Sequence, residues 1–347
     1  MSSEGRPAEK TAGVATWTDP VWRDGALHWA GQQLTRRGLR PDGDPTQPHV
    51  RPWSTAFRLP VDGGAVWLKA VGPGSAQEPP LSAALGEWVP GRVLVPLAVH
   101  AGRRLLLLPD GGPTLRTACR AGSLEAWEEM LRDYARLQQE LAPHADRMVA
   151  LGVPDARPER LPELARDLLA DDEALLLGRP GGLTEQVRDR VLADLGGFAD
   201  VCRALAGSSI PPTLQHDDLH DANVFIGDGR HRFFDWGDAV VSHPFVSLLV
   251  PLRAAARALG VADGDAALLR LRDAYLGSWL DHGSVAAVRE ECELALAVGS
   301  LQRALTWRRI LRGVHVSERA AWQETVAGWT AEYLEPGTPA ARTAVQA

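Results

Sequence analysis

Lysine is nearly absent from this sequence. Only Lys10 and Lys69 occur, beside 35 arginines. Such a bias is typical of a chain encoded in a GC-rich genome. A chain that uses arginine almost everywhere, yet keeps a lysine within the apolar stretch around position 69, invites a functional explanation for that lysine.

Cysteine and long apolar runs are scarce as well, and acidic residues outnumber basic ones. The three cysteines are scattered and lack zinc-site spacing, which favours a reduced, cytoplasmic setting. The net charge of −7 argues against nucleic acid as the main partner, and it would suit a cationic small molecule. No 18-residue apolar run and no signal segment is evident, so no membrane association is expected. The length of 347 residues allows two lobes or domains.

One stretch, residues 214–239, concentrates the chemistry. It contains six aspartates, three histidines and one asparagine within 26 residues. Two short apolar runs, Val224–Ile226 and Phe233–Phe234, flank the segment Gly227–Arg230. Glycine and aspartate tolerate positive φ, so this pattern predicts a hairpin turn between two strands.

Polar side chains lie just before and just after this hairpin. His216, Asp218 and Asn223 precede its first strand, and Asp235 follows its second. Because a hairpin brings its two ends together, we expect the two aspartates and the asparagine to converge. Such oxygen ligands suit a hard divalent ion and leave coordination positions for phosphate oxygens. The spacing His-x-Asp-x₄-Asn, then a hairpin and Asp, is that of the catalytic and metal loops in kinase-like phosphoryl transfer.

The stretch closely resembles the aminoglycoside phosphotransferase family, a kinase-fold group of small-molecule kinases. That family has the catalytic loop His-Gly-Asp-Leu-His-x-x-Asn-Val and a metal loop that begins Asp-Trp. The matching residues are His216, Asp218, Leu219, His220, Asn223, Val224, Asp235 and Trp236. Asp217 departs from the family pattern, which has glycine there. A second carboxylate beside Asp218 is expected to raise the pKa of either group by like-charge repulsion.

Two plainer interpretations of the stretch stay open. Loops rich in aspartate and histidine are often only solvated, and His216 alone would serve as a hydrogen-bonded structural residue. The dyad His216–Asp217 also suits a helical metal phosphohydrolase. That fold needs helices around the dyad, and the predicted hairpin argues against it.

The isolated lysine lies in a second predicted hairpin. Residues Trp53–Leu59 and Ala65–Ala70 form its strands, and Lys69 lies near the end of the second. This position resembles the kinase strand lysine that binds the non-transferred phosphates. The alternative is an edge-strand lysine that prevents aggregation. A kinase lysine needs a glutamate partner, and Glu78, at the start of a predicted helix, is the first candidate, with Glu87 second.

Two further nucleotide contacts are suggested by the resemblance. The segment Pro52–Ala56, with Ser54, is the candidate phosphate loop, although it lacks a glycine-rich motif. The segment Pro109–Thr114, which contains Asp110, is the candidate hinge whose backbone binds adenine.

The remaining pattern is mostly helical. Residues 42–49 suggest a linker, and 93–99 and 104–108 suggest strands. Helices are expected at 17–39, 124–142, 157–177, 183–206, 242–257, 268–280, 285–298, 301–312 and 320–334. The predicted class is α+β, with a bilobal protein-kinase-like fold: a small antiparallel-sheet N-lobe and a larger, mainly helical C-lobe. The expected boundaries are a one-helix extension at 1–49, the N-lobe at 50–112, the C-lobe at 113–335 and a disordered tail at 336–347.

The resemblance implies transfer of the γ-phosphate of ATP, with GTP as the alternative, to a hydroxyl of a small molecule. Asp218 would orient the hydroxyl and accept its proton, and His216 would brace the loop. Asn223 and Asp235 would bind Mg²⁺, and Lys69 would bind phosphate. The expected acceptor is an aminoglycoside or related antibiotic; the alternatives are another metabolite, such as an amino alcohol, sugar or amino acid, or a non-catalytic nucleotide-binding regulator.

Overall fold

The structure is a computed structural model that describes residues 11–118, 123–227 and 229–335. The predicted disordered tail at 336–347, Lys10 and Cys119 lie outside these ranges. The chain divides into two compact units. Unit 1 comprises residues 1–112, 234–237 and 309–322, and unit 2 comprises residues 113–233, 238–308 and 323–347.

Unit 1 contains an antiparallel sheet with the strand order β1-β2-β3-β5-β4. Its strands are β1 (Thr46–Arg51), β2 (Ser54–Val61), β3 (Gly64–Val71), β4 (Ala98–His100) and β5 (Leu105–Pro109). Side chains alternate between the two faces of a strand. One face, with Phe57 and Leu68, forms a hydrophobic core together with Trp29 and Leu34 of the N-terminal helices.

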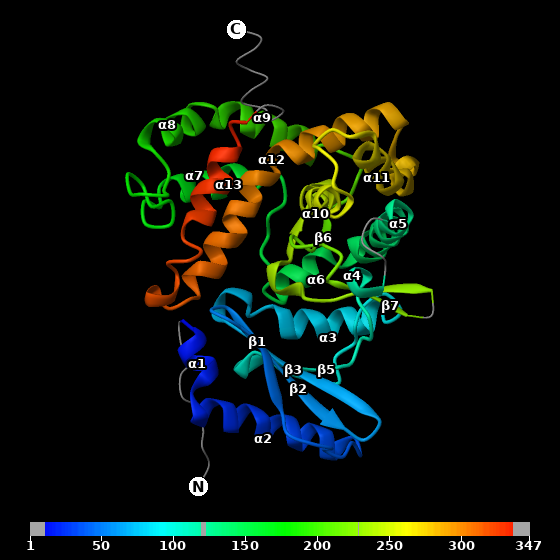
Figure 1. The fold of residues 1–347 in the computed structure, drawn as a ribbon. Coiled ribbons are helices and arrows are strands. Elements are labelled where there is room, and N and C mark those ends of the chain that lie inside the picture. Colours follow the sequence, from blue (N-terminus) through cyan, green and yellow to red (C-terminus); the bar gives the residue numbers. More distant parts are fainter. Residues whose placement is uncertain (1–10, 119–122, 228, 336–347) are drawn as a thin grey trace. The chain divides into compact units, whose positions relative to one another are not determined.

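Two helices precede this sheet where one was expected. They are α1 (Val14–Thr18) and α2 (Pro20–Arg36). The break lies at Asp19, whose side chain accepts a hydrogen bond from the Trp22 N–H, and Pro20 occupies the first position of α2. Both features are typical of a helix start. In Figure 1, α2 and the helix α3 (Glu78–Trp88) lie on opposite sides of the sheet.

The edges of the sheet correct two predictions. The segment expected to be a linker at 42–49 contains most of β1, which pairs with β2. Of the strand expected at 93–99, only the last two residues are in a strand, because β4 begins at Ala98. Pro96 lacks a backbone N–H, so the chain joins the ladder only after it.

Unit 2 is mainly helical. Its helices are α4 (Leu115–Ala118), α5 (Leu124–Leu141), α6 (Ala145–Ala150), α7 (Leu161–Leu169), α8 (Glu185–Ala193), α9 (Leu195–Ala206), α10 (Leu249–Leu259), α11 (Ala266–Leu276), α12 (Val285–Arg312, whose last four residues belong to unit 1) and α13 (Glu324–Glu332). Two short sheets accompany them: β6 (Thr213–Gln215) with β9 (Val240–Ser242), and β7 (Val224–Gly227) with β8 (Arg230–Phe233). The β7–β8 pair confirms the predicted hairpin.

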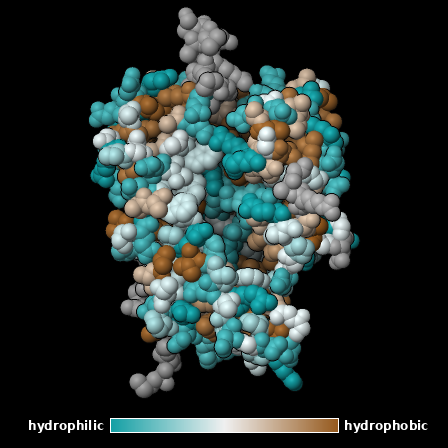
Figure 2. Space-filling model, in the orientation of Figure 1, coloured by the Kyte–Doolittle hydropathy of each residue, from teal (hydrophilic) through white to brown (hydrophobic). Residues whose placement is uncertain are grey.

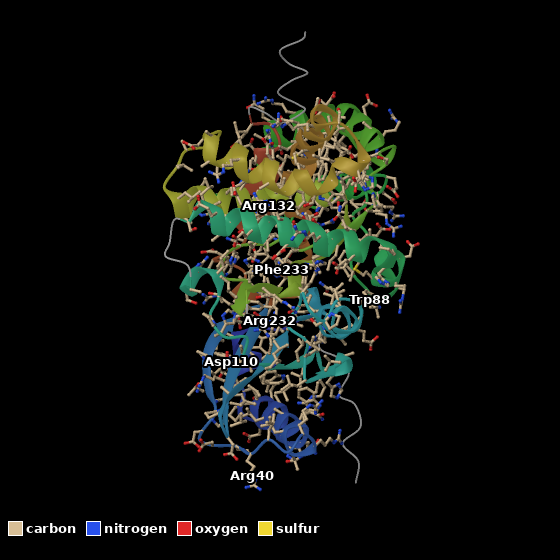
Figure 3. The ribbon with its side chains drawn as sticks, turned by 90° about the vertical axis from the view of Figure 1, so that its right-hand side faces the viewer. Arg40, Trp88, Asp110, Arg132, Arg232 and Phe233 are labelled. Atoms are coloured by element: carbon tan, nitrogen blue, oxygen red, sulfur yellow. The ribbon has the colours of Figure 1, made fainter. Side chains whose placement is uncertain are left out.

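The hairpin is fixed by its buried end. Phe233 is fully buried and packs edge-on against Tyr134 of α5, with ring centroids 5.2 Å apart. Figure 3 labels Phe233 and, on α5, Arg132, which lies on the partly exposed side of that helix.

Helix α12 also differs from expectation, because the sequence suggested two helices interrupted near Gly299. A Cβ at Gly299 would lie 3.1 Å from Leu249 Cδ2 of α10. This glycine therefore permits close packing and does not end the helix. The mixed α+β class predicted from the sequence is confirmed.

A further feature of the fold is the polarity of its surface and of its helices. On the face shown in Figure 2, hydrophilic residues predominate and hydrophobic ones form small separate groups. Among the described residues, no helix has the length and apolarity needed to cross a membrane.

Candidate active site

Lys69 of β3 binds two carboxylates in unit 1. Its Nζ lies 2.5 Å from Oε1 of Glu78 and 2.7 Å from Oδ1 of Asp235. Leu68 and Ala70 belong to the core, so Lys69 projects from the opposite face of the sheet. Burial lowers the pKa of Lys69, but the charges of the two carboxylates outweigh burial and raise the pKa well above its ordinary value. The lysine therefore stays charged at neutral pH.

Glu78 is the first residue of α3, and its side chain is 2% exposed. The other candidate, Glu87, is exposed to solvent near the end of the same helix. Of the two glutamates, Glu78 is the one that contacts Lys69.

The loop that follows β8 is fastened within unit 1. Asp235 has a φ of +68° and a side chain that is 46% exposed. Two residues later, the carbonyl of Gly237 accepts hydrogen bonds from Gln77 Nε2 at 2.8 Å and Arg309 Nη1 at 3.2 Å. Neither of these donors was singled out from the sequence. They hold the loop beside the start of α3, where Glu78 lies.

The remaining nucleotide candidates, Ser54 and Asp110, occupy different surroundings. Ser54 begins β2 and is buried, with its hydroxyl 3.3 Å from His49 Nε2. The neighbouring Thr55 hydroxyl donates to the His49 carbonyl at 2.8 Å and is thereby used within the sheet. Asp110, labelled in Figure 3, is exposed, and its Oδ1 accepts the Gly112 N–H at 3.0 Å. This bond shapes the chain after β5.

The candidate catalytic loop in unit 2 begins where the buried strand β6 ends. Helix α5 fixes this point through two side chains. Gln138 Nε2 donates to the Leu214 carbonyl at 2.9 Å, and Tyr134 Oη accepts the His216 N–H at 2.9 Å. His216 is fully buried, and its Nδ1 accepts the Asp218 N–H at 3.3 Å. The histidine thus forms part of the loop's internal bonding.

The carboxylate of Asp218 is 38% exposed and has a basic side chain beside each oxygen. Arg303 Nη2 donates to Oδ1 at 3.1 Å, and His220 Nε2 lies 3.6 Å from Oδ2. Burial raises the pKa of Asp218, but the bond to His220 and the charge of Arg303 outweigh it and hold the pKa below its ordinary value. Asp218 is therefore ionised at neutral pH.

Asn223 uses its amide nitrogen inside the loop, where Nδ2 donates to the Asp218 carbonyl at 3.0 Å. Its oxygen is the atom suited to a metal. An amide oxygen and an exposed carboxylate, such as that of Asp235, are each hard donors of the kind that Mg²⁺ takes alongside waters and phosphate oxygens. The donor chemistry of these two residues therefore fits that ion.

Asp217 occupies a position with a φ of +61°, the left-handed region that glycine adopts most easily. Aspartate is among the residues that tolerate this region best. Its Oδ1 accepts from Gln215 Nε2 at 3.0 Å, and its Oδ2 lies 3.4 Å from Arg303 Nη1. The expected rise in the pKa of Asp218 from like-charge repulsion is wrong, because His220 and Arg303 beside the carboxylate lower that pKa. No local pattern in the sequence singles out this arginine.

The chain was compared with known proteins. The model of the Phosphotransferase enzyme family matches residues 70–289. No curated protein matches the sequence. Similar solved structures include macrolide 2′-phosphotransferase MphH from Brachybacterium faecium, at 17% identity over 88% of this chain and 97% of that chain, with a TM-score of 0.53.

Two further structures extend the comparison. An ethanolamine kinase from Plasmodium vivax is 12% identical over 92% of this chain and 90% of its own, with a TM-score of 0.59. Amicoumacin kinase hAmiN, in complex with AMP-PNP, Ca²⁺ and Ami, is 13% identical over 91% and 97%, with a TM-score of 0.53. At these identities the likeness concerns the fold, which is the protein-kinase-like fold predicted from the sequence.

Proposed function

Because the chain belongs to the phosphotransferase enzyme family, the group that contains the aminoglycoside phosphotransferases, we propose that it transfers the γ-phosphoryl group of ATP to a hydroxyl of a small molecule. The observation that carries this proposal is the contact of Lys69 with both Glu78 and Asp235. Kinase-type phosphoryl transfer uses a strand lysine paired with a helix glutamate, together with a metal-loop aspartate that binds Mg²⁺, and Lys69 lies beside a candidate for each.

Lys69 is the proposed ligand of the non-transferred phosphates. Its ammonium is a compact charge on a flexible stem, which suits a phosphate oxygen. Glu78, almost fully buried, keeps the lysine in place. Ser54 and the hinge around Asp110 are proposed to contact the rest of the nucleotide.

Asn223 and Asp235 are the proposed ligands of Mg²⁺, which when bound would neutralise charge on the phosphate oxygens. Asp235 is exposed enough to receive such an ion, since nearly half of its side chain is accessible. Asn223 presents its oxygen from a loop whose backbone is fixed by its own amide nitrogen.

Asp218 is proposed to orient the acceptor hydroxyl and to accept its proton. A carboxylate with a lowered pKa is a weak base, so it takes the proton late, after the bond to phosphorus has largely formed. This timing suits the loose transition state of phosphoryl transfer. His216 is proposed to brace the loop through its bond from the Asp218 N–H.

The acceptor is proposed to be an aminoglycoside or a related antibiotic. The similar structures include kinases whose names specify a macrolide, ethanolamine and amicoumacin, so both antibiotics and amino alcohols belong among the candidates. The net charge of −7 favours a cationic acceptor over an anionic one.

A coupled assay of ADP and GDP release tests the proposal. The panel would contain aminoglycosides, macrolides, peptide antibiotics, amino alcohols and hexosamines, each with Mg²⁺ and either ATP or GTP. We expect release that depends on one acceptor class and falls by about 10³-fold in Asp218→Asn, in the range typical of a lost general base. Nucleotide binding without turnover on any acceptor would favour the non-catalytic regulator.

A further inference from the structure

Arg303 of α12 is the cation of a buried charge cluster in unit 2. Its side chain is 5% exposed. Nη1 lies 2.6 Å from Oδ2 of Asp238 and 3.4 Å from Oδ2 of Asp217, and Nη2 lies 3.1 Å from Oδ1 of Asp218. One guanidinium thus serves three carboxylates, one of which is the proposed catalytic group.

We propose that Arg303 is a positioning residue that fixes the orientation of the Asp218 carboxylate, and that Asp217 stands in place of the family's glycine to keep Arg303 in position. This inference rests on the proposed function, because it assumes that Asp218 acts on the acceptor. It concerns geometry within unit 2 alone.

The two terminal nitrogens of Arg303 bind different carboxylates. Nη1 is bound by Asp217 and Asp238, which together set the plane and rotation of the guanidinium. In this orientation Nη2 donates to Oδ1 of Asp218 at 3.1 Å. With Oδ1 held by Arg303, Oδ2, which lies 3.6 Å from His220 Nε2, is the oxygen that we assign to the acceptor hydroxyl. The ring of Trp307, one turn further along α12, lies 5.5 Å from the guanidinium carbon and supports its flat face.

Asp217 is itself held by a chain of buried hydrogen bonds. Ser242 Oγ donates to Gln302 Oε1 at 2.6 Å, Gln302 Nε2 donates to Gln215 Oε1, and Gln215 Nε2 donates to Asp217 at 3.0 Å. The chain ends on Oδ1 of Asp217 and leaves Oδ2 for Arg303. The carboxylate of Asp217 is buried, and a buried charge needs a partner. Arg303 supplies that partner.

Lysine cannot reproduce this arrangement. It retains the positive charge but offers one nitrogen where the guanidinium offers two separated ones. The substitution Arg303→Lys therefore keeps the positive charge but loses the two separate hydrogen-bonding nitrogens that orient the carboxylates. We expect kcat to fall by about 10- to 100-fold, because small displacements of a catalytic group cost this much. KM for the nucleotide should stay within about twofold, since the three carboxylates that Arg303 contacts all belong to unit 2 and none of them is a proposed nucleotide or metal ligand.

Arg308→Lys is the matched control. Arg308 lies on the same helix, is 13% exposed, and donates from Nε to Asp171 Oδ2 at 2.7 Å and from Nη2 to the Asp167 carbonyl at 3.0 Å. Arg308→Lys also replaces a guanidinium that bonds through two nitrogens by an ammonium with one, in a side chain of comparable burial. The partners of Arg308 lie outside the catalytic loop. A purely structural role for Arg303 predicts equal melting-temperature losses and wild-type kcat per folded molecule in both variants. The proposal predicts that only Arg303→Lys loses kcat.

A second variant tests the part played by Asp217 and remains informative if Arg303→Lys does not fold. Asp217→Asn keeps the acceptor for Gln215 and tolerates the left-handed backbone, but removes the charge that holds Nη1. We expect kcat to fall about 3- to 10-fold alone, and no further fall when it is combined with Arg303→Lys, since residues acting through one another are not additive.

The outcomes separate the two proposals. Wild-type kcat in Arg303→Lys, or in Asp217→Asn where the first does not fold, would overturn the positioning role while leaving the proposed function intact. Independent, additive losses in the double variant would overturn the link between Asp217 and Arg303. Full activity of Asp218→Asn in the same assay would overturn the catalytic assignment itself, and the positioning role would fall with it.

Discussion

The two units each contain a cation among carboxylates, and the two clusters differ in design. In unit 1, Lys69 contacts two carboxylates, one of which, Asp235, is 46% exposed. In unit 2, Arg303 is 5% exposed and contacts three. A flexible ammonium beside an open carboxylate can exchange partners when a charged ligand arrives, whereas a buried guanidinium is a fixed scaffold. The first cluster suits binding and the second suits positioning.

The charges of the two clusters support the same contrast. Lys69 with Glu78 and Asp235 has a formal charge of about −1, and phosphates would add more negative charge there. A cation is needed to offset it, which fits the assignment of Asp235 as a metal ligand. The Arg303 cluster has a larger formal excess, about −2, and its carboxylates range from the almost fully buried Asp217 to the partly exposed Asp218. The guanidinium and hydrogen bonds stabilise the buried part of this charge.

The largest effect should come from Asp235→Asn. We expect kcat to fall by about 10³-fold, the cost typical of one electrostatic group that acts on developing charge. The measurement is nucleotide release with a saturating acceptor. Asp62→Asn, at an exposed turn of the same unit, is the control and should retain wild-type rates. Wild-type kcat in Asp235→Asn would show that the exposed carboxylate of the Lys69 cluster has no role in turnover. The proposed functional difference between the two clusters would then be wrong.

Lys69→Arg tests whether a point charge is required in unit 1. The substitution keeps the charge but places a larger, planar group between Glu78 and Asp235. We expect kcat/KM for the nucleotide to fall by about 10²-fold, as for loss of a well-placed phosphate ligand. Arg58→Lys on the neighbouring strand, where the side chain is exposed, should have no effect. If arginine works as well as lysine at position 69, the proposed difference between the clusters is wrong.

The two clusters also differ in how far the sequence predicts them. Lys69 stands out because it is one of two lysines, and it lies in an apolar strand that precedes a helix beginning at Glu78. Local pattern is enough to suggest that pair. Arg303 is one of 35 arginines and lies 85 residues beyond Asp218. Its contact depends on how α12 packs against β6 and the loop after it, and no local pattern encodes that packing.

The same reasoning applies to the fold. The β7–β8 hairpin and α5 are encoded by short-range spacing, and the structure contains both. Strand β1 and the continuity of α12 were missed. A proline- and glycine-rich segment becomes a strand only because β2 offers a partner, and Gly299 is compatible with a helix only because α10 packs against it. Tertiary contacts overrode the local signal in both cases.

Substitutions of Asp217 separate backbone strain from charge in the second cluster. Asp217→Gly removes both the carboxylate and the backbone strain of the positive φ. Asp217→Ala removes the carboxylate but keeps that strain. We expect Asp217→Ala to be less stable than Asp217→Gly by about 1 kcal/mol, the usual cost of a left-handed residue with a Cβ. Urea unfolding at neutral pH measures the difference. Equal stabilities would show that the backbone at this position relaxes and that φ does not explain the family's glycine.

The smallest effect concerns the pH dependence of stability. The folded-state pKa of Asp218 is lowered, so its ionisation stabilises the protein at pH values above the ordinary carboxyl pKa. This stabilisation is lost as pH falls through the folded-state pKa. The stability gap between wild type and Asp218→Asn should therefore be constant from pH 7 to about pH 5 and narrow below about pH 4. The change should be at most ~1 kcal/mol, because the carboxylate is partly open to solvent. Denaturation curves at pH 5, 4 and 3 measure it, and a gap that widens toward acid would mean that burial, and not Arg303 and His220, dominates the ionisation of Asp218.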